Sequence, residues 1–218
     1  MTRARITRLA GWLALTAAAL FALLTMCVVR APHHLLPADT SLHRWSVEHR
    51  PVAASAVARA LTHTGTGVIP YALLLLAGMF AGRTTRQRAL TNAALLACLG
   101  AGQALRYAAM ALIARPRPAI GDWATHASGW SFPSGHTTTA AMTAGLLIAA
   151  LYLRGLRVPR TAVLLIGLWG AAVGLTRVYL GVHWFTDVIG SWLFATAWLS
   201  LLASAYLWRA GDQRPAAV

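Results

Sequence analysis

Six stretches of the 218-residue chain are long and apolar enough to cross a lipid bilayer. A helix needs about 20 mostly apolar residues to span roughly 30 Å of hydrocarbon. Because backbone groups in lipid must be satisfied inside the segment, such runs predict transmembrane helices. The stretches are Leu9–Val29, Val68–Gly82, Ala89–Ala114, Thr137–Leu153, Thr161–Thr176 and Trp184–Trp208. The sequence therefore predicts an all-α bundle of six transmembrane helices, with residues 1–218 forming one integral membrane domain.

Some stretches depart from an ideal span. Val68–Gly82 is short unless its helix begins nearer Leu61, and the third and sixth stretches contain Arg106 and Asp187. Residues 31–60 mix polar and apolar positions, which fits an amphipathic segment at the outer interface or a loop and an early helix start. The first stretch resembles a secretory signal, but it is long for one and no cleavage motif follows. We therefore expect it to stay as a helix.

The basic residues lie between the apolar stretches. All 19 are arginine, against five acidic residues, and the net charge is +14. Only 11% of the residues are charged, whereas a soluble domain has about 25%, so the composition argues against a soluble or disordered chain. A strongly basic chain often binds nucleic acid, but arginines interleaved with apolar spans are typical of a membrane protein. We expect no nucleic-acid partner.

Eleven arginines fall on one side of the six-span topology. They are Arg3, Arg5, Arg8, Arg83, Arg86, Arg88, Arg154, Arg157, Arg160, Arg209 and Arg214. By the positive-inside rule this side is cytoplasmic, so both termini are predicted inside. The composition fits a bacterial inner membrane.

Polar residues with catalytic potential gather at the outer ends of the spans. Arg117 follows the third span, Ser134, Gly135 and His136 precede the fourth, Arg177 ends the fifth, and His183 and Asp187 begin the sixth. In an up-and-down bundle these ends share one depth. The first turn of a helix has free N–H groups and a positive dipole end. The start of the fourth helix is therefore predicted to bind an anion, with Ser134 as its N-cap and as a donor.

The other residues suit phosphate chemistry. His183 and Asp187 are four residues apart, so on a helix they share one face. Asp187 can then accept a hydrogen bond from the N–H of one imidazole nitrogen, which fixes the tautomer and leaves the other nitrogen free to attack. His136 can protonate a departing oxygen. Arg117 and Arg177 can each donate forked hydrogen bonds to phosphate.

Three segments resemble the signatures of the type-2 phosphatidic acid phosphatase family, which includes lipid phosphate phosphatases and vanadium haloperoxidases. They are Arg115-Pro-Arg-Pro, Pro133-Ser-Gly-His136, and Thr176-Arg177 followed by His183 and Asp187, all within 106–187. The resemblance implies a phosphatase that works through a phosphohistidine. It implies His183 as the nucleophile, Asp187 as its partner and His136 as the acid. It also implies that Arg117, Ser134, Gly135 and Arg177 hold the phosphoryl group.

The chain departs from the family pattern at two positions. The family has a lysine seven residues before the arginine of its Arg-Pro pair, where this chain has Met110 or Ala108, depending on the pair counted. Arg106 lies one helical turn before Met110 on the same face, and we assign it to phosphate binding. A buried arginine with a local packing partner is the alternative. Thr176 replaces the usual serine and keeps the hydroxyl.

The remaining histidines and cysteines carry no ligand pattern. His33, His34, His43, His49, His63 and His126 are interpreted as interfacial or loop residues, and we expect neither a metal nor a cofactor. Trp123 and Trp130 are interpreted as interfacial anchors. Cys27 and Cys98 lie within apolar stretches, so no disulfide is expected.

These observations predict a metal-independent lipid phosphatase with its site at the outer membrane surface. An amphiphilic phosphate can enter sideways while its tail stays among the membrane lipids. Phosphatidic acid, a phosphatidylglycerol phosphate and a polyprenyl diphosphate such as undecaprenyl diphosphate are all candidates. Two alternatives stay open: a phosphotransferase on the same scaffold, and a transporter that uses the His/Asp cluster as a proton relay. The oligomeric state is unknown.

Overall fold

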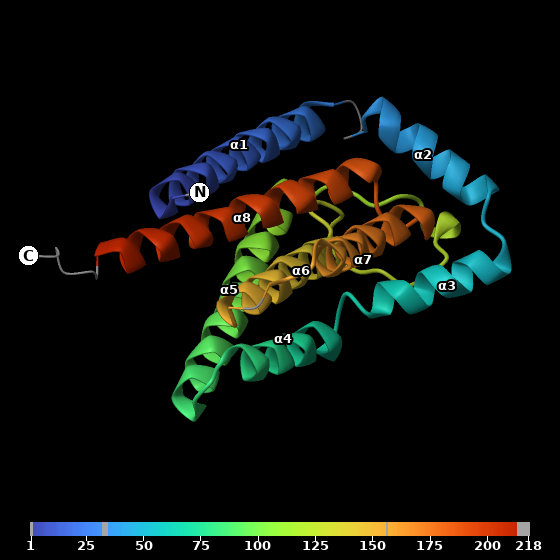
Figure 1. The fold of residues 1–218 in the computed structure, drawn as a ribbon. Helices are drawn as coiled ribbons and strands as arrows, with labels where there is room; N and C mark the ends of the chain where they lie inside the picture. The colour runs from blue at the N-terminus through green and yellow to red at the C-terminus, as the bar shows by residue number, and fades with distance from the viewer. Residues whose placement is uncertain (1, 32–34, 156, 213–218) are drawn as a thin grey trace, which may run out of the picture.

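The computed structural model describes residues 2–31, 35–155 and 157–212, which form an all-helical fold (Figure 1). Its helices are α1 (Arg3–Arg30), α2 (Pro37–Glu48), α3 (Val52–His63), α4 (Val68–Ala81), α5 (Thr85–Ile113), η2 (Ile120–Asp122), α6 (Gly135–Leu153), α7 (Arg160–Tyr179) and α8 (Phe185–Asp212). Of these, η2 is a short 3-10 helix in the loop between α5 and α6. No strand occurs in the described ranges, so the predicted all-α fold class is confirmed.

Five helices are long and apolar enough to cross a membrane, namely α1, α5, α6, α7 and α8. A sixth span is counted only if α3 and α4 form one span, because they pass the same test as a pair bent by 50°. Alone, α4 has 14 residues, about 21 Å at 1.5 Å per residue, which is too short for the hydrocarbon layer. The predicted stretch Val68–Gly82 is therefore helical as expected, but it is one arm of a bent pair.

The bend between α3 and α4 has a steric cause. Gly67 has φ 63° and ψ −139°, a conformation that residues with a side chain rarely adopt. Two residues earlier, a Cβ on Gly65 would overlap the side chain of Val173 on α7. The Trp169 indole donates to the Thr64 hydroxyl at 2.8 Å and ties the turn to the same helix. Close approach of α7 therefore fixes where the chain bends.

Residues 37–63 form two helices at the end of the bundle away from the termini (Figure 1). α2 and α3 are separate helices, and α3 leads into α4. The segment is thus largely helical, and α3 is a helix that begins before the predicted stretch Val68–Gly82. Its position at the membrane interface stays a prediction.

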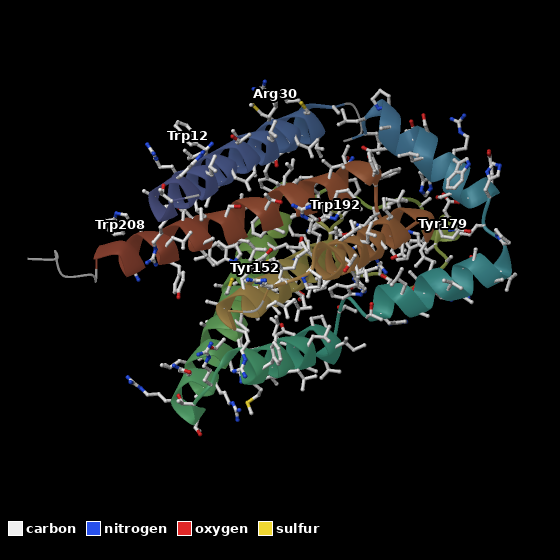
Figure 2. The ribbon with its side chains drawn as sticks, viewed as in Figure 1. Trp12, Arg30, Tyr152, Tyr179, Trp192 and Trp208 are labelled. Carbon is white, nitrogen blue, oxygen red and sulfur yellow. The ribbon has the colours of Figure 1, made fainter. Side chains whose placement is uncertain are left out.

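The arginine-rich turns gather at the other end of the bundle. α1 and α8 run antiparallel, so the start of α1 and the end of α8 lie at the same end of the bundle (Figure 1), and the Ser204 hydroxyl donates to Thr7 O at 3.1 Å. Arg83 Nη2 donates to Arg154 O at 3.4 Å and joins the α4–α5 and α6–α7 turns. Trp12 and Trp208 point outward near this end (Figure 2). The fold is therefore compatible with the predicted cytoplasmic side, which stays a prediction.

The main apolar core lies between α4, α5, α6 and α8. Its fully buried members include Leu74, Leu99 and Met142. A smaller cluster of Ala58, Leu180 and Val182 packs at the opposite end, next to the turn between α7 and α8. The two clusters fix the helices on either side of the polar residues described next.

Candidate active site

Four segments meet at the end of the bundle that carries α2 and α3. They are the loop between α5 and α6, the first turn of α6, the turn between α7 and α8, and the first turn of α8. Ala124 N donates to Leu180 O at 2.9 Å and joins the α5–α6 loop to the turn between α7 and α8. Gly181 has φ 71°, and a Cβ there would lie 2.5 Å from Asp122 O. This glycine therefore allows the two backbones to approach closely.

His183 lies in the turn before α8 and is oriented by Asp187. His183 Nδ1 is 3.2 Å from Asp187 Oδ2, and both side chains are buried. Because an ionised carboxylate only accepts hydrogen bonds, Nδ1 carries the proton and donates it. The lone pair then remains on Nε2, which is the arrangement that a nucleophilic imidazole requires.

Asp187 accepts three further hydrogen bonds, all from protein groups. Trp184 N donates to Oδ2 at 2.8 Å, and the Ser131 hydroxyl donates to the same oxygen. Arg115 Nη1 donates to Oδ1 at 2.5 Å. A fully buried carboxylate is costly unless it is paired and hydrogen-bonded, and these donors meet that requirement. The partner of His183 is thus held rigidly.

Arg117 lies against the free nitrogen of His183. Arg117 Nη1 is 2.8 Å from His183 Nε2 and also donates to Val182 O. Its Nε and Nη2 donate to the carbonyls of Ser128, Gly129 and Trp130 at 2.8–3.0 Å. The guanidinium therefore shapes the α5–α6 loop and places a fixed cation at the nitrogen that is free to react.

Burial and nearby charge act on the ionisation of these two residues. Burial lowers the pKa of His183 from 6.5 to about 4, and the neighbouring Arg117 and Arg177 add to this, while Asp187 opposes it. Burial likewise lowers the pKa of Arg117, with Asp187 opposing. His183 is consequently neutral at physiological pH and carries a free lone pair.

Ser134 occupies the N-cap of α6, as predicted, but its side chain is used differently from the prediction. Within the described chain its hydroxyl makes no capping bond to the helix backbone. Instead it accepts from the Thr137 hydroxyl at 2.9 Å, so its own hydrogen can point elsewhere. The side chain is fully buried. The helix start therefore keeps its first-turn N–H groups available beside a hydroxyl donor.

His136 and Arg177 complete the group. The charged or titratable residues close enough to act on His136 are Arg177, His183, His63 and Arg117. Arg177 is buried and its Nη1 donates to Thr62 Oγ1 at 3.1 Å. Its Nε is also buried, and finds no hydrogen-bond partner among the described residues. A buried guanidinium with an unused donor is a natural anion site.

Arg106 reaches the same region from α5. It is buried, and Nε donates to Gln103 Oε1 at 3.1 Å, while Nη1 lies 3.4 Å from Met110 Sδ. A Cβ built on Gly135 would lie 3.5 Å from its guanidinium carbon. The side chain thus points past Met110, one of the two positions at which the family pattern has its lysine, to the start of α6. The local packing partner weighed as an alternative is also present, since Tyr107 lies under the guanidinium.

Three supporting residues were not among those predicted from the sequence. Asp39 on α2 is fully buried, and its Oδ2 is 2.7 Å from Arg115 Nη2. Thr62 on α3 accepts from Arg177, and Ser131 donates to Asp187. Asp39 and Ser131 occur in segments without recognisable motifs. One signal was available for Asp39, because it is one of only five acidic residues in a chain of 19 arginines.

The other histidines lie around this group in different ways. His43 Nε2 pairs with Asp122 at 2.9 Å. His63 is exposed near His136, while His33 and His34 lie outside the described residues. Among the residues that the structure describes, no three His, Cys, Asp or Glu side chains are grouped to hold a metal ion. Metal independence remains a prediction.

Comparisons with known proteins agree on one family. The model of the PAP2 superfamily matches residues 91–210. Phosphatidylglycerophosphatase B of Bacillus subtilis is 34% identical, over 70% of this chain and 75% of that protein. Undecaprenyl-diphosphatase BcrC of the same organism is 30% identical, over 61% of this chain and 65% of that protein. Lipid A 1-phosphatase of Rhizobium johnstonii is 40% identical, over 39% of this chain and 32% of that protein.

A solved structure has the same fold. It is the crystal structure of a transmembrane PAP2 type phosphatidylglycerolphosphate phosphatase from Bacillus subtilis. The TM-score is 0.76 at 26% sequence identity, and the match covers 92% of this chain and 98% of that one.

Proposed function

The chain belongs to the PAP2 superfamily and is a lipid phosphatase, and from this premise we propose that it acts through a phosphohistidine formed on His183. The observation that carries the proposal is the orientation of one imidazole. Its Nδ1 faces Asp187 at 3.2 Å and its Nε2 faces Arg117 at 2.8 Å. The nitrogen with the lone pair therefore lies beside a cation that attracts phosphate.

In the proposed complex, the phosphate lies among Arg117, Arg177, Arg106 and the start of α6 at Ser134 and Gly135. These donors neutralise the charge that spreads over the equatorial oxygens during transfer. The buried Arg177 Nε, with no partner among the described residues, is free to donate to one of them. Arg117 then exchanges its contact with Nε2 for a contact with a phosphate oxygen.

His183 Nε2 attacks phosphorus, forming the N–P bond as the bond to the leaving oxygen breaks. The anionic phosphate bound beside His136 favours its protonated form, and this imidazolium gives its proton to the leaving oxygen, so that His136 becomes neutral and the lipid alcohol or lipid monophosphate departs. Water next attacks the phosphohistidine while His136 accepts a proton from it. The N–P bond breaks, inorganic phosphate leaves, and His183 returns to its neutral form. Asp187 stabilises the charge on the imidazole in both steps.

We propose that the protein is a multi-pass cell-membrane protein with six spans, cytoplasmic termini and an outward-facing site. The arginine-rich turns at the end opposite the site support this orientation. Fusions of a fluorescent protein and of a periplasmic alkaline phosphatase to the C-terminus test it. We expect the fluorescent-protein fusion to fluoresce and the alkaline phosphatase fusion to be inactive. The reverse pattern would overturn the proposed orientation.

The substrate is proposed to be an amphiphilic lipid phosphate or diphosphate, such as phosphatidic acid, phosphatidylglycerol phosphate or undecaprenyl diphosphate. The names of the relatives given above describe phosphatases of such lipids. Because these relatives are enzymes, the transporter interpretation is set aside. A phosphotransferase would pass the phosphoryl group to a second acceptor in place of water.

The test is phosphate release by purified protein from a panel of these lipids in mixed micelles containing EDTA. We expect hydrolysis without added metal, and strict dependence on a divalent cation would contradict the mechanism. His183→Ala and His136→Ala should each lower turnover by roughly 10³-fold or more. The control is His126→Ala, an exposed histidine of the α5–α6 loop, which should retain full activity. Thin-layer analysis of the lipid products separates hydrolysis from transfer.

A further inference from the structure

Asp39 is an acidic residue that the structure buries completely and that lies outside the matched family region in the sequence. It lies on α2, whereas the PAP2 match begins at residue 91. Its carboxylate accepts from Arg115 Nη2 at 2.7 Å and from Thr186 N at 2.9 Å. It also accepts from the Thr186 hydroxyl at 2.9 Å and from Leu36 N at 3.1 Å. A carboxylate this well bonded holds its neighbours in place.

These contacts connect Asp39 to the proposed nucleophile through two residues. Arg115 donates from Nη2 to Asp39 and from Nη1 to Asp187 and the Thr186 hydroxyl. Asp187 in turn faces His183 Nδ1. The side chains of Asp39, Arg115 and Asp187 are all fully buried, so solvent does not screen this series of contacts.

We propose that Asp39 is a positioning residue for His183, acting through Arg115 and Asp187. The inference rests on the proposed function, since it concerns the orientation of the same nucleophile. Asp39 fixes Arg115 from one side and the first turn of α8 from the other, through Thr186 N. Both contacts determine where the Asp187 carboxylate lies, and hence where His183 Nε2 points.

Charge balance gives Asp39 a second effect. The Arg115 guanidinium is shared between two carboxylates, Asp39 and Asp187. When a neutral side chain replaces Asp39, the whole positive charge of Arg115 acts on Asp187. The Asp187 carboxylate then stabilises protonated His183 less strongly. The other groups that face His183 are Arg117 from the α5–α6 loop, Arg177 from α7 and His136 from α6, and they stay unchanged.

The test compares Asp39→Asn with Glu48→Gln in the full-length protein. Both changes remove one negative charge from α2, but Glu48 is exposed. Phosphate release from phosphatidic acid in mixed micelles is measured against substrate concentration and pH. For Asp39→Asn we expect kcat to fall about 10–100-fold with KM within about twofold, because the nucleophile is misplaced rather than the phosphate site. The acid limb of the pH–kcat/KM profile of Asp39→Asn, where activity is lost as His183 becomes protonated, should also move to lower pH.

The control and the conservative variant separate positioning from stability alone. Glu48→Gln should keep wild-type kcat and acid limb. Asp39→Glu keeps the charge, so its acid limb should stay at the wild-type position even if kcat falls. A purely structural role predicts loss of folded protein with an unchanged acid limb. Thermal unfolding in detergent therefore accompanies every variant.

Each outcome bears on one of the two proposals. If wild type releases no phosphate from any lipid of the panel, the proposed function fails. If wild type is active and folded Asp39→Asn keeps its kcat and its acid limb, the positioning role of Asp39 is wrong. If Asp39→Asn does not fold, Asp39→Glu decides instead, because an unchanged kcat in that variant contradicts the requirement for an accurately placed carboxylate.

Discussion

Replacing Asp187 with asparagine tests how the carboxylate serves His183. Oδ2 faces three donors, from His183, Trp184 and Ser131, whereas Oδ1 accepts from Arg115. An asparagine at this position has one NH₂ group and one carbonyl oxygen, so its NH₂ must occupy the place of either Oδ2 or Oδ1. Turned toward Oδ2, that group would oppose three donors, but turned toward Oδ1 it opposes one. The amide oxygen should therefore face His183, and the imidazole should keep its proton on Nδ1.

The cost of Asp187→Asn is then mainly electrostatic. At the 3.2 Å separation of Nδ1 and Oδ2, a carboxylate stabilises a cationic imidazole by about 5 kcal/mol for an effective dielectric constant near 20. A hydrogen bond to a charged group is roughly twice as strong as one between neutral groups, so an amide oxygen that still accepts the bond retains about half of this. The remaining loss of about 2.5 kcal/mol corresponds to roughly a 10²-fold decrease in kcat. Asp187→Ala removes the acceptor as well, and the full loss corresponds to about 10⁴-fold.

The assay is phosphate release from a lipid phosphate in detergent, with thermal unfolding to confirm that each variant folds. Asp187→Asn is expected to lie about midway, on a logarithmic scale, between wild type and Asp187→Ala. If the asparagine variant is as inactive as the alanine variant while folded, its amide does not face His183 as argued. If it is fully active, the carboxylate charge has no role in the reaction.

Two further outcomes follow from the geometry. With its pKa at about 4, His183 should be about 90% neutral at pH 5 against about 3% for an unperturbed imidazole. The acid limb of kcat/KM, corrected for substrate ionisation, should thus lie near pH 4, and a limb at 6.5 would contradict the burial argument. Gly174→Ala should lower the unfolding temperature, because its Cβ would lie 2.8 Å from Thr137 Cγ2 and overpacking costs about 1–3 kcal/mol. In Gly167→Ala no described atom lies within 4 Å of the new Cβ, so this matched control should be neutral or slightly stabilising.

Local sequence patterns were sufficient to predict much of the fold and to predict that the candidate site residues lie close together. Apolar length alone identifies α1, α5, α6, α7 and α8, because each is long enough to satisfy its backbone in lipid by itself. The motifs at the helix ends meet because consecutive helices are antiparallel, so the end of one spanning helix and the start of the next lie on the same side of the bundle. His183 and Asp187 pair because a spacing of four residues places them on one helical face.

What the sequence did not predict depends on contacts between distant segments. The bend before α4 requires α7 to approach Gly65, and local hydropathy carries no record of this contact. Arg115 and Asp39 are 76 residues apart, and neither segment contains a periodic signal that links them. The Ser134 side chain was expected to cap α6, but the hydroxyl of Thr137, one turn along, competes for it. These features depend on tertiary packing.

Contacts between the N-terminal helices and the C-terminal half of the chain limit how segments of such proteins can be exchanged. The family match covers residues 91–210, yet two of its buried arginines find carboxylate or hydroxyl partners on α2 and α3. Arg115 contacts Asp39, and Arg177 contacts Thr62. A chimera that joins this C-terminal half to the N-terminal helices of a relative without these partners would break the buried Arg115–Asp39 ion pair, at a cost of about 3–5 kcal/mol. It would also remove the hydroxyl acceptor of Arg177, at a cost of about 1.5–3 kcal/mol. Segment exchange should therefore carry α2 and α3 together with the half that they support.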